Sequence, residues 1–250
     1  MTKDSFALVI QARVGSTRAP YKIMYDLNGA PLIERILQRV KRVKRVKKII
    51  LATTKKKEDN ILVKIAKLNK VEIFRGSEND LVDRYYQAVK NQKIDHVLRL
   101  PADNPIPDHI EYNRLIEYHL KSNNDFSSNI MDFMNNGYPT GIGVEIFTFS
   151  ALKKVWKIEK RKKYREHVAL NFYDYENKKK NNKFNFKIGT LKCPKKIARP
   201  ELVFHVDHYK EYLFFKELYQ YFFPKNKFFT TKDVIHWYDK IYLKKNKKLK

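Results

Sequence analysis

The sequence predicts an α/β fold built around a mainly parallel β-sheet. Over about the first hundred residues, short apolar segments of strand length alternate with longer segments whose apolar residues recur at helical spacing. The apolar segments run into glycine, proline or hydroxyl residues, which interrupt regular structure. This alternation is typical of β-α-β crossovers, whose strands are parallel and whose ligands bind at the carboxyl ends of the strands.

The first part of the chain accounts for four expected strands. Pro31 stands where a helix begins, and apolar residues then recur at helical spacing as far as Val40. We expect strands over residues 6–10, 48–54, 71–74 and 96–100, and helices over residues 32–40, 58–68 and 79–90.

The alternation becomes less regular after about Ser122, as it would if a smaller layer were added to the sheet. Ser150 is a suitable N-cap for a helix that continues through Trp156. We expect further strands over residues 143–149, 184–188 and 202–206, and further helices over residues 165–175, 209–223 and 231–242. The sequence shows no internal repeat, no glycine- or serine-rich linker and no domain boundary, and only its last lysine-rich residues are expected to fray.

The composition is that of a globular protein. The chain has 250 residues, of which 43% are hydrophobic and 14% aromatic, and this argues against disorder. It has no apolar run of transmembrane length, and it enters a strand-like segment almost at once instead of a signal peptide, so we expect a cytoplasmic protein without membrane insertion. Cys193 is the single cysteine, which excludes an intrachain disulfide and a cysteine-based zinc site within one chain.

The net charge of +26 has two interpretations. An excess of this size invites a nucleic-acid or other polyanion partner. The excess is mostly lysine, however, and it is spread along the chain without a recognisable nucleic-acid module. We therefore expect a solvated basic surface and no nucleic-acid partner, and a polyanion-binding surface remains the alternative.

The loop after the first expected strand has the features of a phosphate-binding site. Between Val9 and Lys22, an apolar run gives way to Gly15, hydroxyls and the cations Arg13, Arg18 and Lys22. Backbone N–H groups and cations at the end of a strand suit a polyphosphate. The alternative is an ordinary connection whose charges face water.

Asp103 and Asp207 each follow an expected strand. Because the carboxyl ends of parallel strands converge, the two side chains can meet although they are far apart in sequence. Paired carboxylates with open coordination positions suit Mg²⁺, which keeps waters and substrate phosphates among its ligands. For either aspartate alone, a turn or a helix cap explains its position equally well.

Two histidine-containing segments carry weaker signals. His205, Asp207 and His208 suggest a transition-metal site, but they form one short motif without a separate third ligand. His167 stands alone on an expected helix, where a packed or surface histidine is the ordinary case.

Taken together and in order, the motifs of the chain resemble those of the cytidylyltransferase family. The nearest branch is the one named after the spore coat polysaccharide protein SpsF, which is related to the synthetases of CMP-activated acidic sugars. The resemblance covers residues 6–242, and the opening motif and the Ala-Asp-Asn-Pro segment are specific in combination. The motifs are Gln11-Ala-Arg-Val-Gly-Ser-Thr-Arg-x-Pro-x-Lys22, Ala52-Thr53-Thr54, Arg75-Gly-Ser77, Asp83-Arg84-Tyr85, Arg99-Leu-x-Ala-Asp103-Asn-Pro105, Gly143-Val-Glu145 and Arg165-Glu-His167.

The resemblance implies a nucleotide-diphospho-sugar transferase fold, which is a Rossmann-like three-layer sandwich of the GT-A type. It implies one nucleotidyltransferase domain over residues 1–242, with a nucleotide half over about 1–122, a sugar-binding half over about 123–242, and a basic tail over 243–250. The implied reaction is CTP plus a sugar or sugar acid giving CMP-sugar plus pyrophosphate, with Mg²⁺, in polysaccharide or glycan biosynthesis. Relatives often dimerise through the section that corresponds to residues 125–138, so a homodimer is implied as well.

The resemblance also assigns roles to individual residues. Arg13, Lys22 and Asp103 are the implied catalytic residues, and Asp103 and Asp207 the implied metal ligands. The implied nucleotide-binding residues are Ala12, Arg13, Gly15, Ser16, Lys22, Thr53, Arg84 and Asp103. The implied sugar-binding residues are Pro139, Gly141, Glu145, Arg165 and His167.

Three positions depart from the family pattern. Tyr209 replaces a common proline and Glu211 a common second aspartate, and both are expected to affect only the entry to a helix. Thr140 stands where a Pro-x-Gly segment often holds aspartate, and a lost carboxylate in the sugar half changes which acceptor can bind.

Other functions remain open at this point. A glycosyltransferase of related fold is expected to carry an Asp-x-Asp motif, where this chain has Ala-Asp103-Asn. A basic polyanion-binding protein and a non-catalytic scaffold of a sugar pathway are the alternatives outside catalysis. The presence of Arg13, Lys22, Asp103 and Asp207 argues against a scaffold.

Overall fold

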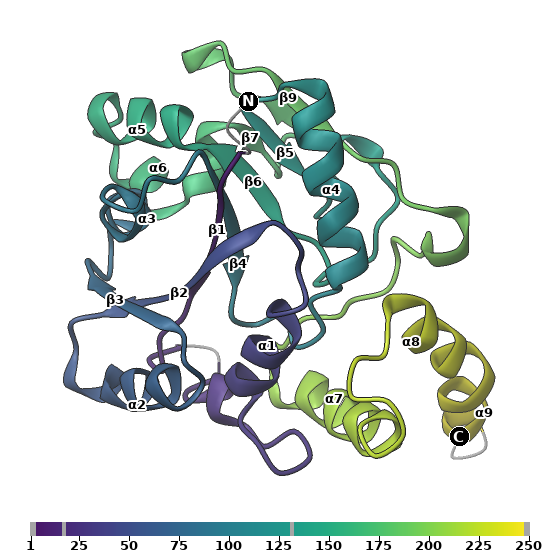
Figure 1. Cartoon of the computed structure of the whole chain (residues 1–250). Coiled ribbons are helices and arrows are strands. Elements are labelled where there is room, and N and C mark those ends of the chain that lie inside the picture. The colour runs from purple at the N-terminus through teal and green to yellow at the C-terminus, as the bar shows by residue number, and fades with distance from the viewer. Residues whose placement is uncertain (1–3, 17–18, 131–132, 248–250) are drawn as a thin grey trace.

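A computed structural model describes residues 4–16, 19–130 and 133–247 of the chain. Within these residues, seven strands form one central sheet in the order β3-β2-β1-β4-β6-β5-β9 (Figure 1). The strands are β1 (Phe6–Gln11), β2 (Val46–Thr54), β3 (Glu72–Gly76), β4 (His96–Pro101), β5 (Phe126–Ser128), β6 (Glu145–Thr148) and β9 (Ile188–Thr190), and a separate small hairpin pairs β7 (Tyr173–Asp174) with β8 (Lys179–Lys180).

The sheet is mainly parallel, as the sequence predicts. Strand β1 pairs in parallel with β2 and with β4, and β2 pairs in parallel with β3. Only β6 runs against its neighbours β4 and β5, while β5 and β9 are again parallel. The antiparallel strand joins the two halves of the sheet, since it pairs Arg99 of β4 with Glu145 of β6.

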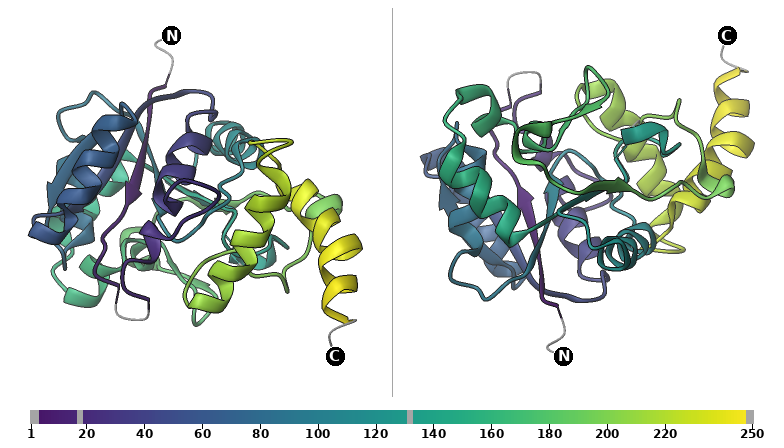
Figure 2. Two further views of the ribbon diagram at one scale, coloured as in Figure 1. Left: turned by 90° about the horizontal axis from the view of Figure 1, so that it is seen from below. Right: turned by 90° about the horizontal axis from the view of Figure 1, so that it is seen from above.

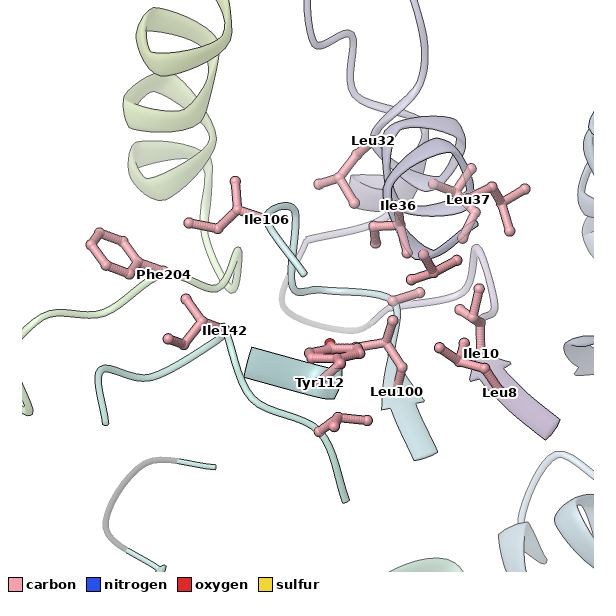
Figure 3. Packing of buried hydrophobic residues seen from close by; sticks show 14 of the residues in the cluster. Leu8, Ile10, Leu32, Ile36, Leu37, Leu100, Ile106, Tyr112, Ile142 and Phe204 are labelled. Carbon is pink, nitrogen blue, oxygen red and sulfur yellow. The ribbon is translucent and has the colours of Figure 1, made fainter. Parts of the chain in front are cut away.

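Helices cover both faces of this sheet. Alternate residues of β1 divide between the faces: Leu8 and Ile10 pack with α1, α2, α4, α7 and α8, whereas Ala7 and Val9 pack with α3 and α5. Figure 3 shows the first of these cores from close by. The helices are α1 (Leu32–Val40), α2 (Asn60–Leu68), α3 (Leu81–Val89), α4 (His109–Ser122), α5 (Phe149–Ile158), α6 (Lys162–Glu166), α7 (Tyr209–Phe222), α8 (Thr231–Trp237) and α9 (Leu243–Lys247).

The C-terminal helices lie at one side of the molecule. Figure 2 shows α8 and α9, in yellow, on the side away from α2 and β3. Helix α8 is tied to α4 because the carboxylate of Asp108, at the start of α4, accepts hydrogen bonds from the N–H and hydroxyl groups of Thr231. Among the described residues, no helix is long and apolar enough to cross a membrane.

The structure departs from the sequence predictions mostly in the second half. Helix α4 and strand β5 were not predicted, and α5 is capped by the hydroxyl of Thr148, which accepts the Ala151 N–H, and not by Ser150. The predicted helix over 165–175 is wrong, because α6 ends at Glu166 and is followed by a 3₁₀ turn and by β7. The strands predicted over 184–188 and 202–206 are wrong as well: β9 begins only at Ile188, and in the second segment only Val203 forms a bridge, with Thr140.

The topology brings three loops to one edge of the sheet. In the sheet register, Gln11 at the end of β1 lies between Ala52 of β2 and Pro101 of β4. The loops that follow these strands therefore start side by side. They carry most of the residues that the sequence assigns to a nucleotide site.

Candidate active site

Lys22, Asp103 and Asp207 come together at this edge, and we call them the carboxylate cluster. The Lys22 ammonium lies 3.1 Å from Asp207 Oδ1 and 3.7 Å from Asp103 Oδ2, and it donates a hydrogen bond of 2.6 Å to the carbonyl of Val206. The Lys22 side chain is only 10% exposed, so these contacts hold a nearly buried cation. The expected meeting of Asp103 and Asp207 is thus present in the structure.

Backbone contacts position the segment that carries Asp207. The N–H of Val206 donates to the carbonyl of Asp103 at 2.9 Å. Upstream, Thr140 exchanges backbone hydrogen bonds with Leu202 and Phe204. Gly141 makes this packing possible, because its φ is +83° and a Cβ there would lie 2.1 Å from the Phe204 carbonyl oxygen.

The carboxylate cluster suits a hard cation better than a transition metal. Two aspartate oxygens already gather around one ammonium, and such oxygen ligands are those that Mg²⁺ prefers. His205 Nε2 lies 3.4 Å from Asp207 Oδ2. Over residues 4–16, 19–130 and 133–247, no three histidine, cysteine or acidic side chains form a metal-binding group, so neither the His205–Asp207–His208 segment nor the carboxylate cluster supplies three such ligands. This shortage weighs less against Mg²⁺, which keeps waters and substrate phosphates among its ligands.

A cavity of about 190 Å³, the first cavity, opens between the loop after β1 and helix α3. It is lined by Gln11, Ala12, Arg13, Glu78, Leu81, Arg84, Arg99, Glu166 and His167. Arg84 is 3% exposed, and its Nε and Nη1 atoms have no hydrogen-bond partner among the described residues. Burial lowers the pKa of Arg84. A buried guanidinium with unused donors is costly, and an acceptor brought close to Arg84 would lower this cost, so the first cavity is a candidate binding site.

A buried carboxylate fixes the conformation of the loop after β1. Asp59, which is 1% exposed, accepts a hydrogen bond of 2.8 Å from the Val14 N–H and another from the Thr54 hydroxyl. Gly15 lies over the neighbouring Glu58, since a Cβ on Gly15 would lie 2.9 Å from Glu58 Oε1. In the same loop, the Ser16 hydroxyl accepts from the Ala19 N–H.

The cations of this loop do not all act together in the structure. Arg13 lines the first cavity and forms an ion pair of 3.0 Å with Glu78, which also contacts Lys56 at 2.8 Å. The hydrogen bond from Lys56 is the main reason why the pKa of Glu78 lies below its ordinary value. Lys22 belongs to the carboxylate cluster, and Arg18 lies outside the described residues.

A second cavity, of about 330 Å³, shares Arg99 and His167 with the first. The nearly buried Glu145 is held there by an ion pair of 2.5 Å with Arg99 and by a hydrogen bond of 2.7 Å from the Tyr175 hydroxyl. Burial by itself lowers the pKa of Arg99, but Glu145 and Tyr85 outweigh it and leave this pKa raised. The other lining residues are Ile130, Lys163, Ala169, Leu170 and Glu176.

Some residues that the sequence assigns to the site lie elsewhere. The Arg165 guanidinium is bound to Asp80 and to the carbonyls of Trp156 and Glu159, so it stabilises the α3–α6 contact and does not line the first or second cavity. Gly141 packs against the segment that leads to Asp207, and neither Pro139 nor Gly141 lines these two cavities. Thr53 is fully buried in β2, and its hydroxyl has no hydrogen-bond partner among the described residues.

Other residues were missed by the sequence reasoning. Gln11 and Arg99 belong to the quoted motifs without an assigned role, yet the Gln11 side-chain oxygen accepts hydrogen bonds from Arg99 and from Tyr85. Asp59 and Tyr175 gave no signal, because each acts through a contact between segments far apart in sequence. Glu211 accepts the His208 N–H at the start of α7, which agrees with its expected part in the helix entry.

Comparison with known proteins places this geometry in context. The family model described as cytidylyltransferase matches residues 7–241. An uncharacterized protein of Methanocaldococcus jannaschii is 38% identical over 214 residues, which cover 86% of this chain and 83% of that protein. The spore coat polysaccharide biosynthesis protein SpsF of Bacillus subtilis is 28% identical over 222 residues, with 87% of each chain covered. Among solved structures, a cytidylyltransferase from Leptospira borgpetersenii superimposes with a TM-score of 0.83 at 29% identity and with 95% of each chain covered.

Proposed function

The chain belongs to the cytidylyltransferase family, and we propose that it transfers CMP from CTP to a hydroxyl of a sugar or sugar acid and releases pyrophosphate. The observation that carries the proposal is the carboxylate cluster, in which Lys22 and two aspartates from distant segments converge. The first cavity, which begins at the same end of β1 and is lined by Arg13 and the buried Arg84, supports it. The carboxylate cluster would bind the polyphosphate of a nucleotide, and the first cavity would bind its nucleoside. The similarity to SpsF supports an acceptor from polysaccharide biosynthesis.

The residues divide between the two substrates in this proposal. Arg84 and the backbone around Ala12 hold the nucleoside in the first cavity, and Arg13 and Lys22 hold the triphosphate. The acceptor enters the second cavity, where Glu145 and Tyr175 accept from and donate to its hydroxyls. Because the two cavities share Arg99 and His167, the acceptor approaches the nucleotide from the side of these residues.

The chemistry requires alignment and charge stabilisation. The acceptor oxygen forms a bond to the α-phosphorus while the bond to the bridging oxygen of pyrophosphate breaks, and the hydroxyl proton is lost to solvent or to a nearby base. Arg13 exchanges Glu78 for a phosphate oxygen, and Lys22 exchanges its aspartate partners in the same way. Both cations then stabilise the negative charge that develops on the leaving group.

Asp103 and Asp207 are the proposed Mg²⁺ ligands. They fit this role because both carboxylates already converge on one cation, and their side chains are 32% and 19% exposed, which leaves room for waters or phosphate oxygens. When bound, Mg²⁺ would supply charge neutralisation for the phosphate oxygens. The two aspartates would orient it, and Lys22 would then be available to the triphosphate.

Pyrophosphate release tests the proposal. The purified chain would be incubated with Mg²⁺, with each of the four ribonucleoside triphosphates, and with a panel of sugar acids and amino sugars. We expect release with CTP and at least one acceptor, and much less with the other nucleotides. Release with no combination would overturn the proposal. Consumption of a CMP-sugar without pyrophosphate would point to a glycosyltransferase instead.

A further inference from the structure

A third cavity, of about 350 Å³, has Arg or Lys at half of its lining positions, and we call it the basic cavity. It lies between α6 and the β7–β8 hairpin, and it contains none of the residues assigned above to catalysis or nucleotide binding. Its lining residues are Arg161, Lys163, Tyr164, Leu170, Asp174, Lys179, Lys180, Asn181, Asn182 and Lys183.

The basic cavity adjoins the second cavity, which in turn adjoins the first. It shares Lys163 and Leu170 with the second cavity, just as the second cavity shares Arg99 and His167 with the first. Residues 161–170 thus contribute to all three cavities in turn. The basic cavity and the second cavity therefore adjoin at Lys163 and Leu170.

Two of the cations are fixed in place before any ligand binds. The carboxylate of Glu159, whose side chain is fully buried, accepts hydrogen bonds of 2.7 Å from Arg161 Nη2 and from Lys183 Nζ. The hydrogen bond from Arg161 is the largest cause of the lowered pKa of Glu159. Arg161 also stacks on the Tyr164 ring, with its guanidinium carbon 3.8 Å from the ring centre. Prearranged cations lose less entropy when an anion binds than mobile ones do.

The charges around the basic cavity do not balance. Five cations line it, and three carboxylates lie close to them, those of Glu159, Asp174 and Glu176. Asp174 is engaged by the N–H groups of the following turn, at Glu176 and Asn177. Lys180 donates to the uncharged carbonyl of Ile188. The excess of two positive charges matches the charge of a phosphate monoester, which carries about −1.5 to −2 at neutral pH.

We propose that the basic cavity binds a phosphate monoester of the acceptor, remote from the hydroxyl that receives CMP. This inference rests on the proposed function, because it takes the second cavity as the acceptor site. The substrate is accordingly a phosphorylated sugar or sugar acid, long enough to extend through the second cavity. Lysine ammonium groups act as point charges toward phosphate and place few demands on its orientation.

The test uses the double variant Lys179→Ala/Lys180→Ala. Neither lysine contacts Glu159, so the replacement leaves no buried carboxylate unpaired. The matched control is Lys216→Ala/Lys232→Ala, which removes the same charge from exposed positions on α7 and α8. Inorganic phosphate would be titrated into each full-length protein with CTP and Mg²⁺ at saturation, and the amide NMR signals of Asn181 and Lys183 followed. We expect saturable shifts in the wild type and the control, and about a tenfold weaker affinity in the double variant.

A kinetic comparison shows whether the site serves the acceptor. Each sugar acid of the panel would be supplied with and without a phosphate ester on its terminal hydroxyl. We expect kcat/KM to be about tenfold higher or more for the phosphorylated member, and this preference to vanish in the double variant while KM for CTP stays unchanged.

Three results would overturn the inference, and they are distinguishable. Absence of phosphate-induced shifts in the wild type removes the anion site. If phosphate shifts the amide signals but kcat/KM is equal for the phosphorylated and unphosphorylated acceptors, the basic cavity binds inorganic phosphate and not the acceptor. Shifts in a chain that releases no pyrophosphate with any acceptor overturn the proposed function, and with it the acceptor's part of the inference.

Discussion

Lys22 links three segments that lie far apart in the sequence. Its ammonium contacts Asp103 after β4, Asp207 before α7 and the carbonyl of Val206, while Lys22 itself follows β1. A nearly buried ammonium needs such partners, because an unpaired charge at this depth is costly. Lys22 therefore holds the two aspartates together, in the position that the proposed reaction gives to a divalent cation.

Replacement of Asp103 by asparagine tests this arrangement. Asp103→Asn keeps the size of the side chain but removes the charge, so we expect pyrophosphate release from CTP to fall by about 10²- to 10³-fold while the fold is retained. Asp26→Asn is the control, because Asp26 is exposed and contacts the Gly29 N–H outside the cluster. Steady-state rates and thermal unfolding of both variants are the measurements, and near-normal turnover of Asp103→Asn would remove the metal assignment.

Asp59 provides a second test at a residue that does not line the first cavity. In Asp59→Ala the Val14 N–H and the Thr54 hydroxyl lose their buried acceptor, and the loop after β1 loses its fixed shape. We expect affinity for CTP to fall by about tenfold, on the scale of one hydrogen bond to a charged group. Asp59→Asn retains one oxygen and should restore much of the affinity. Calorimetric titration of CTP distinguishes this from mere destabilisation, and unchanged affinity in Asp59→Ala would exclude a role in shaping the loop.

A comparison of two loop glycines distinguishes the cost of an unfavourable backbone conformation from the cost of a steric clash. Gly29 and Gly141 have nearly the same φ, +86° and +83°, but a Cβ on Gly29 would meet nothing within 4 Å, whereas on Gly141 it would collide with the Phe204 carbonyl. We expect Gly29→Ala to cost about 1 kcal/mol. Gly141→Ala should cost about 1–3 kcal/mol more and also lower activity, because Phe204 leads to Asp207. Urea unfolding measures both, and equal losses would show that the contact with Phe204 relaxes easily.

The contact of α4 with the sheet contains a buried histidine pair. His119 on α4 is 1% exposed, and its ring contacts His96 of β4 at 3.1 Å and the Ser127 hydroxyl at 2.9 Å. Burial, aided by His96, lowers the pKa of His119 from 6.5 to about 3. Burial also lowers the pKa of His96, against the effect of Asp4 and Asp95.

This histidine makes stability depend on pH in a defined window. Below pH 6.5 the unfolded chain protonates at His119 and the folded chain does not until about pH 3, so stability is retained above this window and lost as the pH falls through it. The expected loss is about 1.4 kcal/mol per pH unit. Urea unfolding between about pH 7 and pH 5.5 should show a smaller loss for His119→Gln than for the wild type. Identical slopes would show that His119 is protonated in the folded state as well.

The sequence predicted helices correctly where a local signal marks them. The helices at 32–40 and 79–90 were predicted nearly to their ends because apolar residues recur at helical spacing, and Pro31 marks the start of α1. Helix α4 was missed although Asp108 caps it through the Ile110 N–H. The helix predicted over 165–175 fails at His167, whose backbone leaves the helical region.

The site was predictable where it depends on strand ends. Asp103 follows β4 as expected, and it meets Asp207 through Lys22. The strand expected before Asp207 is absent, however, and backbone hydrogen bonds of residues 202–206 with Thr140 and Asp103 bring Asp207 to the cluster instead. The orientation of Arg165 was not predictable, since its partner Asp80 lies 85 residues away and no local pattern joins the two. Side chains that serve through tertiary contacts, such as Tyr175, leave no trace in sequence spacing.

At the scale of the whole molecule, one segment of the chain contributes to three cavities. Residues 161–170 connect the first cavity at β1 and α3 to the second cavity at β6 and to the basic cavity at β7 and β8. The α6 segment therefore contributes to the proposed nucleotide site as well as to the proposed acceptor site. Part of the net charge of +26 lies at one place, because five of the cations line the basic cavity.

The position of a radioactive label in the products tests cytidylyl transfer most directly. CTP labelled at the α-phosphate or at the γ-phosphate would be supplied with Mg²⁺ and with the acceptor that gives the most pyrophosphate. We predict that the α-label enters a sugar-linked product and the γ-label enters pyrophosphate, and that Asp103→Asn forms both about 10²- to 10³-fold more slowly. Transfer of the γ-label to the sugar, or release of the α-label as CMP alone, would contradict the account.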